Sequence, residues 1–164
     1  MTVKSGETVL MEGVNIFYLN FEGKEGQYNK DGDRNFAVEL PEDTAAQMAE
    51  DGWNVKRTKP REQEVAEDPD AVGRPWLPVA VEYRKGKPPK IVMVTSRGKT
   101  VLLEDTVALL DAADIQNTDL IVAASVWEVN GNSGVKAYLR SMFITIEEDE
   151  LERKYADLDE QGGG

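Results

Sequence analysis

Three side chains at alternate positions near the carboxyl end of the chain could contact a charged polymer: Lys136, Tyr138 and Arg140. Alternate residues of a β-strand point to the same face, so this spacing would place an aromatic ring between two cations. Such a face can stack a nucleobase on the ring while the cations meet phosphates. The alternative is an ordinary solvated sheet face with a surface tyrosine, and the pattern taken alone favours that alternative.

Other aromatic residues also stand beside basic ones. Trp53 precedes a run of bases, Trp76 follows Arg74, and Tyr18 lies on a strand-like segment that could extend the same platform. Single-strand grooves combine rings and cations in this way, although such rings also serve as core anchors. The candidate nucleic-acid-binding residues are Tyr18, Lys30, Arg34, Trp53, Lys56, Arg57, Lys59, Arg61, Trp76, Arg84, Lys85, Lys87, Lys90, Arg97, Lys99, Lys136, Tyr138 and Arg140.

Catalytic and metal-binding motifs are missing or incomplete. The chain has no cysteine and no histidine, which excludes disulfides, Cys/His zinc sites, thiol nucleophiles and imidazole triads. Gly98-Lys99-Thr100 resembles the end of a phosphate-binding loop, but Met93 stands where that motif requires glycine. No pair of carboxylates supports an acid/base assignment. We therefore expect no enzyme, no cofactor and no metal.

The elements that must position these residues are mostly strands. Alternating and apolar patterns predict strands over residues 14–21, 35–40, 77–83, 91–95, 120–129 and 135–146, with 101–103 as an extension. Helices are expected over 41–50 and 104–113, whereas 56–75 is expected to be mostly loop. This succession predicts a mostly β fold, an OB-fold-like small barrel with one or two short helices. We assign it residues 1–146 and expect a flexible acidic C-terminal tail over 147–164.

The last two strands are joined by residues 130–134, Asn-Gly-Asn-Ser-Gly, which predict a hairpin. If Val129 faces Val135 across this loop, Trp127 opposes Ala137 and is buried beside a small partner. The same register turns the basic and aromatic residues of the last strand outward. Residues 84–90 form a basic loop, which would contact phosphates under one interpretation and be a plain solvated connection under the other.

The net charge of −12 argues at first sight against a nucleic-acid partner. Its distribution is uneven, because residues 147–164 hold eight acids and two bases, whereas residues 53–99 hold eleven bases and six acids. Acidic ends are often interaction tails, and a solubilising end is the alternative. The net charge therefore does not exclude a nucleic-acid partner, but a nucleic-acid-binding protein of this composition must keep its acidic residues away from the binding surface.

No apolar run approaches the ~20 residues of a membrane span, and the first residues lack the apolar centre of a signal peptide. We expect a soluble, cytoplasmic protein with no membrane partner.

Several segments carry a family resemblance. The most specific are Trp127-Glu128-Val129-Asn130-Gly131, Gly134-Val135-Lys136-Ala137-Tyr138-Leu139 and Thr145-Ile146-Glu147-Glu148-Asp149-Glu150-Leu151, with further matches over 20–29, 34–38, 53–56, 59–62, 88–92 and 95–100. Together they cover most of residues 13–158, and the chain resembles single-stranded DNA-binding proteins of tailed actinobacterial phages. The resemblance implies an OB-fold protein that coats single strands during phage DNA replication, recombination or repair.

The resemblance also implies that the acidic C-terminus contacts replication or recombination proteins or competes with DNA for the groove. One departure concerns the last residues, which are Gln161-Gly162-Gly163-Gly164, where many single-strand binders carry a terminal aromatic. Leu151, Tyr155 and Leu158 have helical spacing and could form an apolar stripe instead. That stripe could bind a partner protein, the chain's own barrel or a second copy in a homo-oligomer.

The leading hypothesis is sequence-independent binding of single-stranded DNA by base stacking and phosphate contacts. An acidic DNA mimic or protein-interaction adaptor is the first alternative, which the net charge supports and the basic segment opposes. A virion structural protein is the second. A gel shift with single- and double-stranded oligonucleotides would separate the first hypothesis from both alternatives.

Overall fold

The computed structural model describes residues 3–26 and 29–147. The strands are β1 (Thr8–Met11), β2 (Ile16–Asn20), β3 (Arg34–Glu39), β4 (Lys56–Arg57), β5 (Pro75–Val81), β6 (Lys90–Thr95), β7 (Gly98–Leu102), β8 (Asp114–Val129) and β9 (Asn132–Glu147). The helices are α1 (Glu42–Glu50), α2 (Glu62–Glu67) and the 3₁₀ helix η1 (Val107–Ala112).

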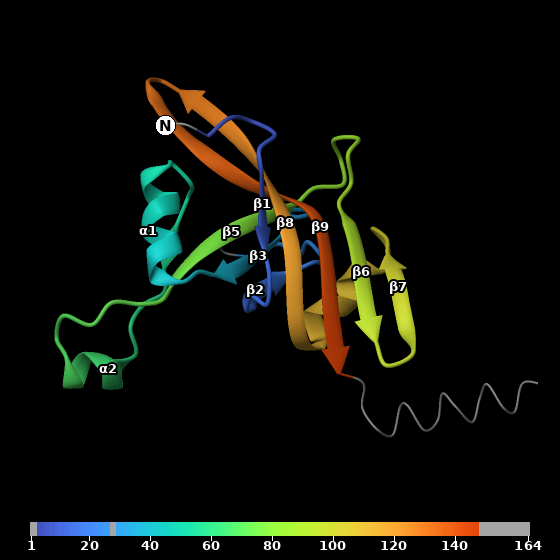
Figure 1. The fold of residues 1–164 in the computed structure, drawn as a ribbon, viewed down its shortest axis with the longest axis horizontal. Helices are drawn as coiled ribbons and strands as arrows, with labels where there is room; N and C mark the ends of the chain where they lie inside the picture. Colours follow the sequence, from blue (N-terminus) through green and yellow to red (C-terminus); the bar gives the residue numbers. More distant parts are fainter. Residues whose placement is uncertain (1–2, 27–28, 148–164) are drawn as a thin grey trace, which may run out of the picture.

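One sheet contains all the strands, in the order β1-β8-β9-β5-β3-β2, with β4 paired to β5 and the β6–β7 hairpin paired to β9. The long β8–β9 hairpin forms its spine (Figure 1). On its other edge β9 pairs in parallel with β5 at Ala137 and Tyr138, and then with β6 from Ser141 to Thr145. The chain between β5 and β6 therefore leaves the sheet and returns farther along the same strand.

The structure confirms the predicted mostly β fold with short helices. The strand pairing leaves the sheet open, with β1 and β2 at its edges, so no closed ring of described strands forms. Three elements were not predicted, β1, β4 and α2. Strands β1 and β4 have only four and two residues, and α2 buries none of its residues, so none of the three carries a periodic apolar signal.

The predicted register of the last hairpin was wrong by three residues. Val129 pairs with Asn132 and Trp127 with Gly134, so the turn consists of Asn130 and Gly131 alone. Both turn residues have positive φ, 49° and 81°, as a type I′ turn requires. Trp127 is consequently 44% exposed instead of buried.

A β-bulge at Arg140 switches the faces of β9. Ser141 pairs with Ile121 and Leu139 with Val122, which leaves Arg140 as the extra residue. The buried residues are therefore Val135, Ala137 and Leu139 before the bulge and Met142 and Ile144 after it. Strict alternation along β9 would place Phe143 on the same face as Val135, Ala137 and Leu139, but the bulge leaves it 41% exposed on the opposite face.

The core lies on the inner face of the sheet, between the strands, η1 and α1. Its largest fully buried side chains include Phe21, Phe36, Leu77, Ile91 and Leu120. The carboxylate of Asp111, from η1, accepts hydrogen bonds from the backbone N–H groups of Phe21 and Glu22 at 2.7 and 2.9 Å. No helix within the described part of the chain is long and apolar enough to cross a membrane.

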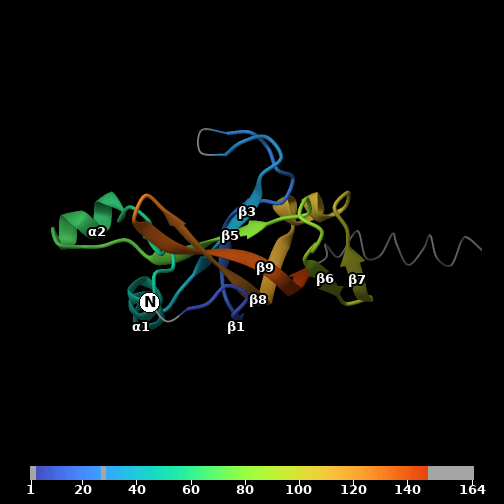
Figure 2. The same cartoon turned by 90° about the horizontal axis from the view of Figure 1, so that it is seen from above.

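The molecule is elongated, and two projections mark its ends. Helix α2 lies at one end of the long axis and the β6–β7 hairpin at the other, as two perpendicular views show (Figures 1 and 2). The outer face of the sheet lies between them.

Candidate nucleic-acid interface

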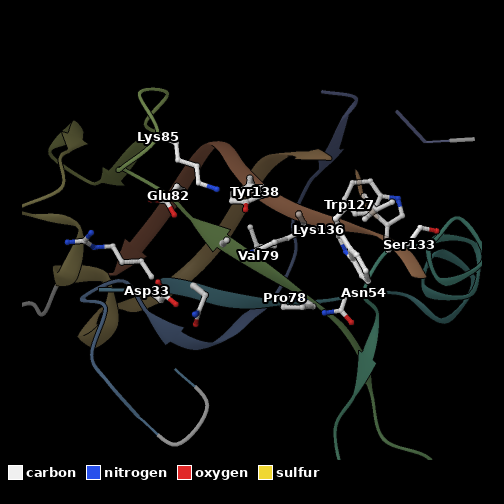
Figure 3. Close-up of a pocket in the computed structure, with 18 of the residues that line it drawn as sticks. Asp33, Asn54, Pro78, Val79, Glu82, Lys85, Trp127, Ser133, Lys136 and Tyr138 are labelled. Carbon is white, nitrogen blue, oxygen red and sulfur yellow. The ribbon is translucent and has the colours of Figure 1, made fainter. Parts of the chain in front are cut away.

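The outer face of β5 and β9 forms the floor of a groove of about 910 Å³. Residues from β3, β5, β9, the α1–β4 connection and the tip of the β8–β9 hairpin line it (Figure 3). Its lining includes Asp33, Arg34, Asn35, Trp53, Asn54, Pro78, Ala80, Glu82, Arg84, Lys85, Trp127, Ser133, Gly134, Lys136 and Tyr138.

Tyr138 lies on the floor of this groove between two lysines. The Nζ atom of Lys136 is 5.0 Å from the centre of the Tyr138 ring, and that of Lys85 is 5.5 Å away. Lys85 comes from the loop after β5, whereas Lys136 lies two residues before Tyr138 on β9. The structure thus places Lys136 beside Tyr138, whereas Lys85 is the second cation and Arg140 lies outside the groove lining; the binding role of these residues stays a prediction.

Trp127 forms the other end of the groove, beside Ser133 and Asn54 (Figure 3). Its ring lies against the backbone of Gly134, where an added Cβ would stand 2.7 Å from Cζ2. Glycine at this position therefore allows the ring to lie flat on β9. Gly134 and Tyr138 are four residues apart on one strand, so the two rings sit about 13 Å apart along the groove.

A network of charges closes the groove near Lys85. Arg84 binds Glu82 through Nε at 2.8 Å and Asp33 through Nη2 at 2.9 Å. Hydrogen bonds from the Arg84 guanidinium lower the pKa of Glu82 to about 2, and the two carboxylates raise the pKa of Arg84. One arginine thus offsets much of the negative charge of two acids, which leaves Lys85 and Lys136 to make this surface basic.

A second aromatic cluster continues the same face of β5. Trp76, Pro78 and Ala80 alternate along the strand, and Ala80 pairs with Tyr138. The Trp76 ring contacts Phe17 and Tyr18 edge to face, at centroid distances of 5.9 and 5.4 Å. Trp76 lies four residues from Ala80, about 13 Å along the strand.

Tyr18 reaches this cluster through an unusual backbone conformation. Its φ is +51°, within a break in the β2–β3 register between Phe17 and Asn20. Non-glycine residues with positive φ cost free energy and concentrate at functional sites. The break turns the Tyr18 ring outward, where it is exposed.

Basic residues surround the second cluster. The Nζ atom of Lys56 lies 5.7 Å from the centre of the Trp76 ring. A smaller hollow of about 290 Å³ adjoins Phe17 and Tyr18, and Lys59, Arg61 and Arg74 also line it. Of these bases, Arg61 and Arg74 also face carboxylates, Glu64 and Glu39, at 4.0 and 3.9 Å.

Three predicted ligands have structural roles instead. Trp53 is 6% exposed and packs in the core, so it offers no ring face although it adjoins the groove. Arg34 donates from Nε to the Phe21 carbonyl oxygen at 2.9 Å, and its guanidinium lies 5.2 Å from the Tyr83 ring. Arg57 binds Glu42 through two hydrogen bonds of 3.0 and 2.7 Å.

The remaining predicted bases lie outside the lining of both hollows: Lys30, Lys87, Lys90, Arg97, Lys99 and Arg140. Lys99 instead lies 5.7 Å from the ring centre of Phe143, on the β6–β7 side of β9. The tail residues Leu151, Tyr155 and Leu158 lie outside the described residues, and their partner-binding role stays a prediction. Among residues 3–26 and 29–147, no three potential ligands of His, Cys, Asp or Glu type gather as a metal site.

Sequence reasoning missed Trp127, Phe17, Asn35 and Asn54. The signal for Trp127 was present, since Asn-Gly is the preferred two-residue type I′ turn and fixes Trp127 opposite Gly134. Asn35 is positioned by its side-chain hydrogen bond to Asn29 Oδ1 at 2.6 Å, which depends on a loop conformation. Asn54 reaches the groove only through the pairing of Trp53 with Val135.

Comparisons with known proteins bear on the family and the fold. The family model for the phage ssDNA-binding domain matches residues 1–162. A C-terminally truncated single-stranded DNA-binding protein from bacteriophage Enc34 is similar, with a TM-score of 0.52, 10% identity and 87% of each chain covered. The same phage protein in complex with ssDNA gives a TM-score of 0.52 and 11% identity, over 91% of this chain and 94% of that one. No protein of curated function matches the chain.

Proposed function

The chain belongs to the phage ssDNA-binding domain family, and we propose that it binds single-stranded DNA without sequence preference in the groove over β5 and β9. The binding needs no catalysis. We further propose that it protects single strands during phage DNA replication, recombination or repair, in the host cytoplasm.

The position of Tyr138 between Lys85 and Lys136 carries this proposal. An aromatic face accepts any base, because every base has a π surface. The two lysines are held near the ring by cation–π attraction, which is worth only about 0.5–1 kcal/mol at exposed sites. A phosphate can therefore draw each ammonium away while a base takes its place on the ring.

Two further ring sites extend the path of the strand. Trp127 offers an exposed ring about 13 Å from Tyr138 along β9, and Trp76 with Tyr18 lies at the far end of the same face of β5. Lys56, Lys59 and Arg74 stand beside that second cluster to meet phosphates. Rings that alternate with cations support a path across the face rather than a single pocket.

Support from a relative comes from the phage Enc34 protein of similar fold, which is known in complex with ssDNA. Because that protein is only 11% identical to this chain, the location of the proposed site is argued from the groove residues of this chain alone.

The acidic residues 147–164 have a separate proposed role. Their eight acids and two bases can compete with a DNA strand for the lysines of the groove, or recruit replication or recombination proteins. The excess of negative charge in this segment supports both roles.

The net charge of −12 favours one competing function, that of an acidic DNA mimic that occupies another protein's DNA site. A mimic requires an acidic surface, whereas the groove presents Lys85 and Lys136 and has its two acids paired with Arg84. The groove geometry therefore favours DNA binding.

A gel shift with matched single- and double-stranded oligonucleotides at two salt concentrations tests the proposal. We expect the single strand to be retarded, with affinity that falls steeply as salt rises, since bound phosphates release counterions. A mimic or a virion protein would retard neither oligonucleotide, and that result would overturn the proposal.

A further inference from the structure

Residues 58–74, which we call the arm, leave the sheet between β4 and β5 and carry α2 at their tip (Figure 1). Residues 61–70 are all exposed, and α2 buries none of its side chains. A six-residue helix is unstable in water without packing. Two apolar side chains of the arm, Val65 and Val72, are also exposed, Val72 to 66%. The described chain therefore offers the tip of the arm nothing to pack against.

The base of the arm, in contrast, is firmly attached. Thr58 and Arg74 exchange hydrogen bonds of 3.0 and 2.9 Å. Gly73 lies so close to Thr58 that an added Cβ would overlap the Thr58 carbonyl oxygen. Arg57 donates to the Gly73 carbonyl oxygen at 2.9 Å while it also binds Glu42. These contacts give the arm a fixed direction, away from the sheet.

The charge of the arm tip excludes DNA as its partner. Residues 62–72 contain five acids and no base, so phosphates would be repelled. Residues 90–103, which include the β6–β7 hairpin, contain three bases and no acid. That segment also presents exposed apolar side chains, Val101 and Leu103, beside exposed Phe143 of β9. The two surfaces are thus complementary in charge, and each has apolar side chains to bury.

The two surfaces cannot meet within one molecule. The arm and the β6–β7 hairpin lie at opposite ends of the long axis, with β5 and the β8–β9 hairpin between them (Figures 1 and 2). The groove, which β5 and β9 line, therefore separates the two surfaces. A contact between them must join two copies head to tail. A head-to-tail contact that does not close into a ring generates an open chain of copies.

We propose that the arm of one copy docks on the β6–β7 end of the next copy bound to the same DNA strand. This inference rests on the proposed function, because the strand aligns the copies. Val65 and Val72 pack against Val101, Leu103 and Phe143, and acids of the arm pair with Lys90 and Lys99. The contact makes binding to long strands cooperative.

Cross-linking tests this contact directly, because the natural chain contains no cysteine. Val65→Cys and Val101→Cys are made as separate proteins, and both positions are exposed. An equimolar mixture is treated with a short bifunctional maleimide on a long oligonucleotide and on one that holds a single copy. We expect a cross-linked dimer only on the long strand, on the order of tenfold above its yield on the short one, because neighbours share a high effective concentration.

A matched control uses Val129→Cys, which is also an exposed valine but lies at the tip of the β8–β9 hairpin. Its mixture with Val101→Cys should give no more dimer than the short strand does. Equal yields from the two mixtures would overturn the proposal. A dimer from Val65→Cys alone would overturn it as well, since that product indicates a symmetric contact.

A third measurement distinguishes protein from DNA as the partner that binds the β6–β7 end. Val101→Cys is labelled with a monofunctional maleimide on the short strand. We expect its labelling rate to remain that of the free protein, and protection by a single short strand would overturn the proposal. Fluorescence anisotropy on the same short strand measures DNA binding itself, so a failure of the proposed function is recognised separately from a failure of the head-to-tail contact.

Discussion

Replacing Tyr138 with alanine removes the ring that lies between Lys85 and Lys136 on the floor of the groove. Tyr138 is half-buried and faces away from the core, so the fold should persist. Loss of a stacked base costs about 1–3 kcal/mol. Because the ring gives up two cation–π contacts when a base arrives, the lower part of this range applies, about 1–2 kcal/mol.

That free energy corresponds to a dissociation constant about five to thirty times larger, at about 1.4 kcal/mol for each factor of ten. Tyr138→Phe keeps the ring and should bind within about twofold of the natural protein. Fluorescence anisotropy of a labelled single strand at fixed salt measures both constants, and circular dichroism checks the fold. The reasoning fails if Tyr138→Ala binds as the natural protein does, or if Tyr138→Phe loses as much affinity as Tyr138→Ala.

Four further predictions concern the groove and the tail. Lys85→Ala and Lys136→Ala should each lower the slope of log affinity against log salt by about 0.7, because each removes one phosphate contact; unchanged slopes in titrations at several salt concentrations would count against those contacts. Trp127→Phe should remove part of the fluorescence quenching caused by DNA and leave the part due to Trp76, since Trp53 is buried; unchanged quenching would show that Trp127 lies off the path of the strand. Glu82 has its pKa lowered from 4.5 to about 2, so its stabilising effect is complete above pH 4.5 and is lost as pH falls through about 2. Glu82→Gln should therefore flatten the dependence of the melting temperature on pH between these values, and an unchanged profile would contradict the ion pair. Deleting residues 148–164 removes seven acids and two bases and should tighten DNA binding or leave it unchanged, whereas a large loss of affinity would refute a masking role.

The alternation of residues along the chain was enough to locate most of the sheet. Strand β5, for example, lies between the charged residues Arg74 and Glu82, and its residues alternate between buried and partly exposed positions. Tyr138 and Lys136 were identified for the same reason, because a period of two decides which face each residue takes.

Local periodicity could not predict what depends on pairing between distant segments. Lys85 joins Tyr138 only because β5 runs parallel to β9 at Ala80. Phe143 lies on the outer face of β9 because Arg140 is one extra residue in the strand, and the local composition does not predict that bulge. Trp127 was assigned to the core because the turn was taken as five residues long.

The cations were the least predictable part of the site. A basic residue in a sequence can bind a phosphate or an acid of its own fold, and the sequence does not distinguish these uses. Arg57 binds Glu42 and Arg84 binds Glu82 and Asp33, whereas no ion pair forms at Lys85 or Lys136 among the described residues. Only the three-dimensional arrangement separates cations that are available to DNA from those that hold the fold.

The location of the DNA strand on the outer face of β5 and β9 is the central claim, and photo-cross-linking tests it most directly. A single strand that carries 5-iododeoxyuridine is bound, irradiated and digested, and the modified peptides are identified by mass spectrometry. We expect the modifications at Tyr138 and Trp127, whose rings line the groove. Modification confined to the arm or to the β6–β7 hairpin, with the groove peptides intact, would contradict the claim.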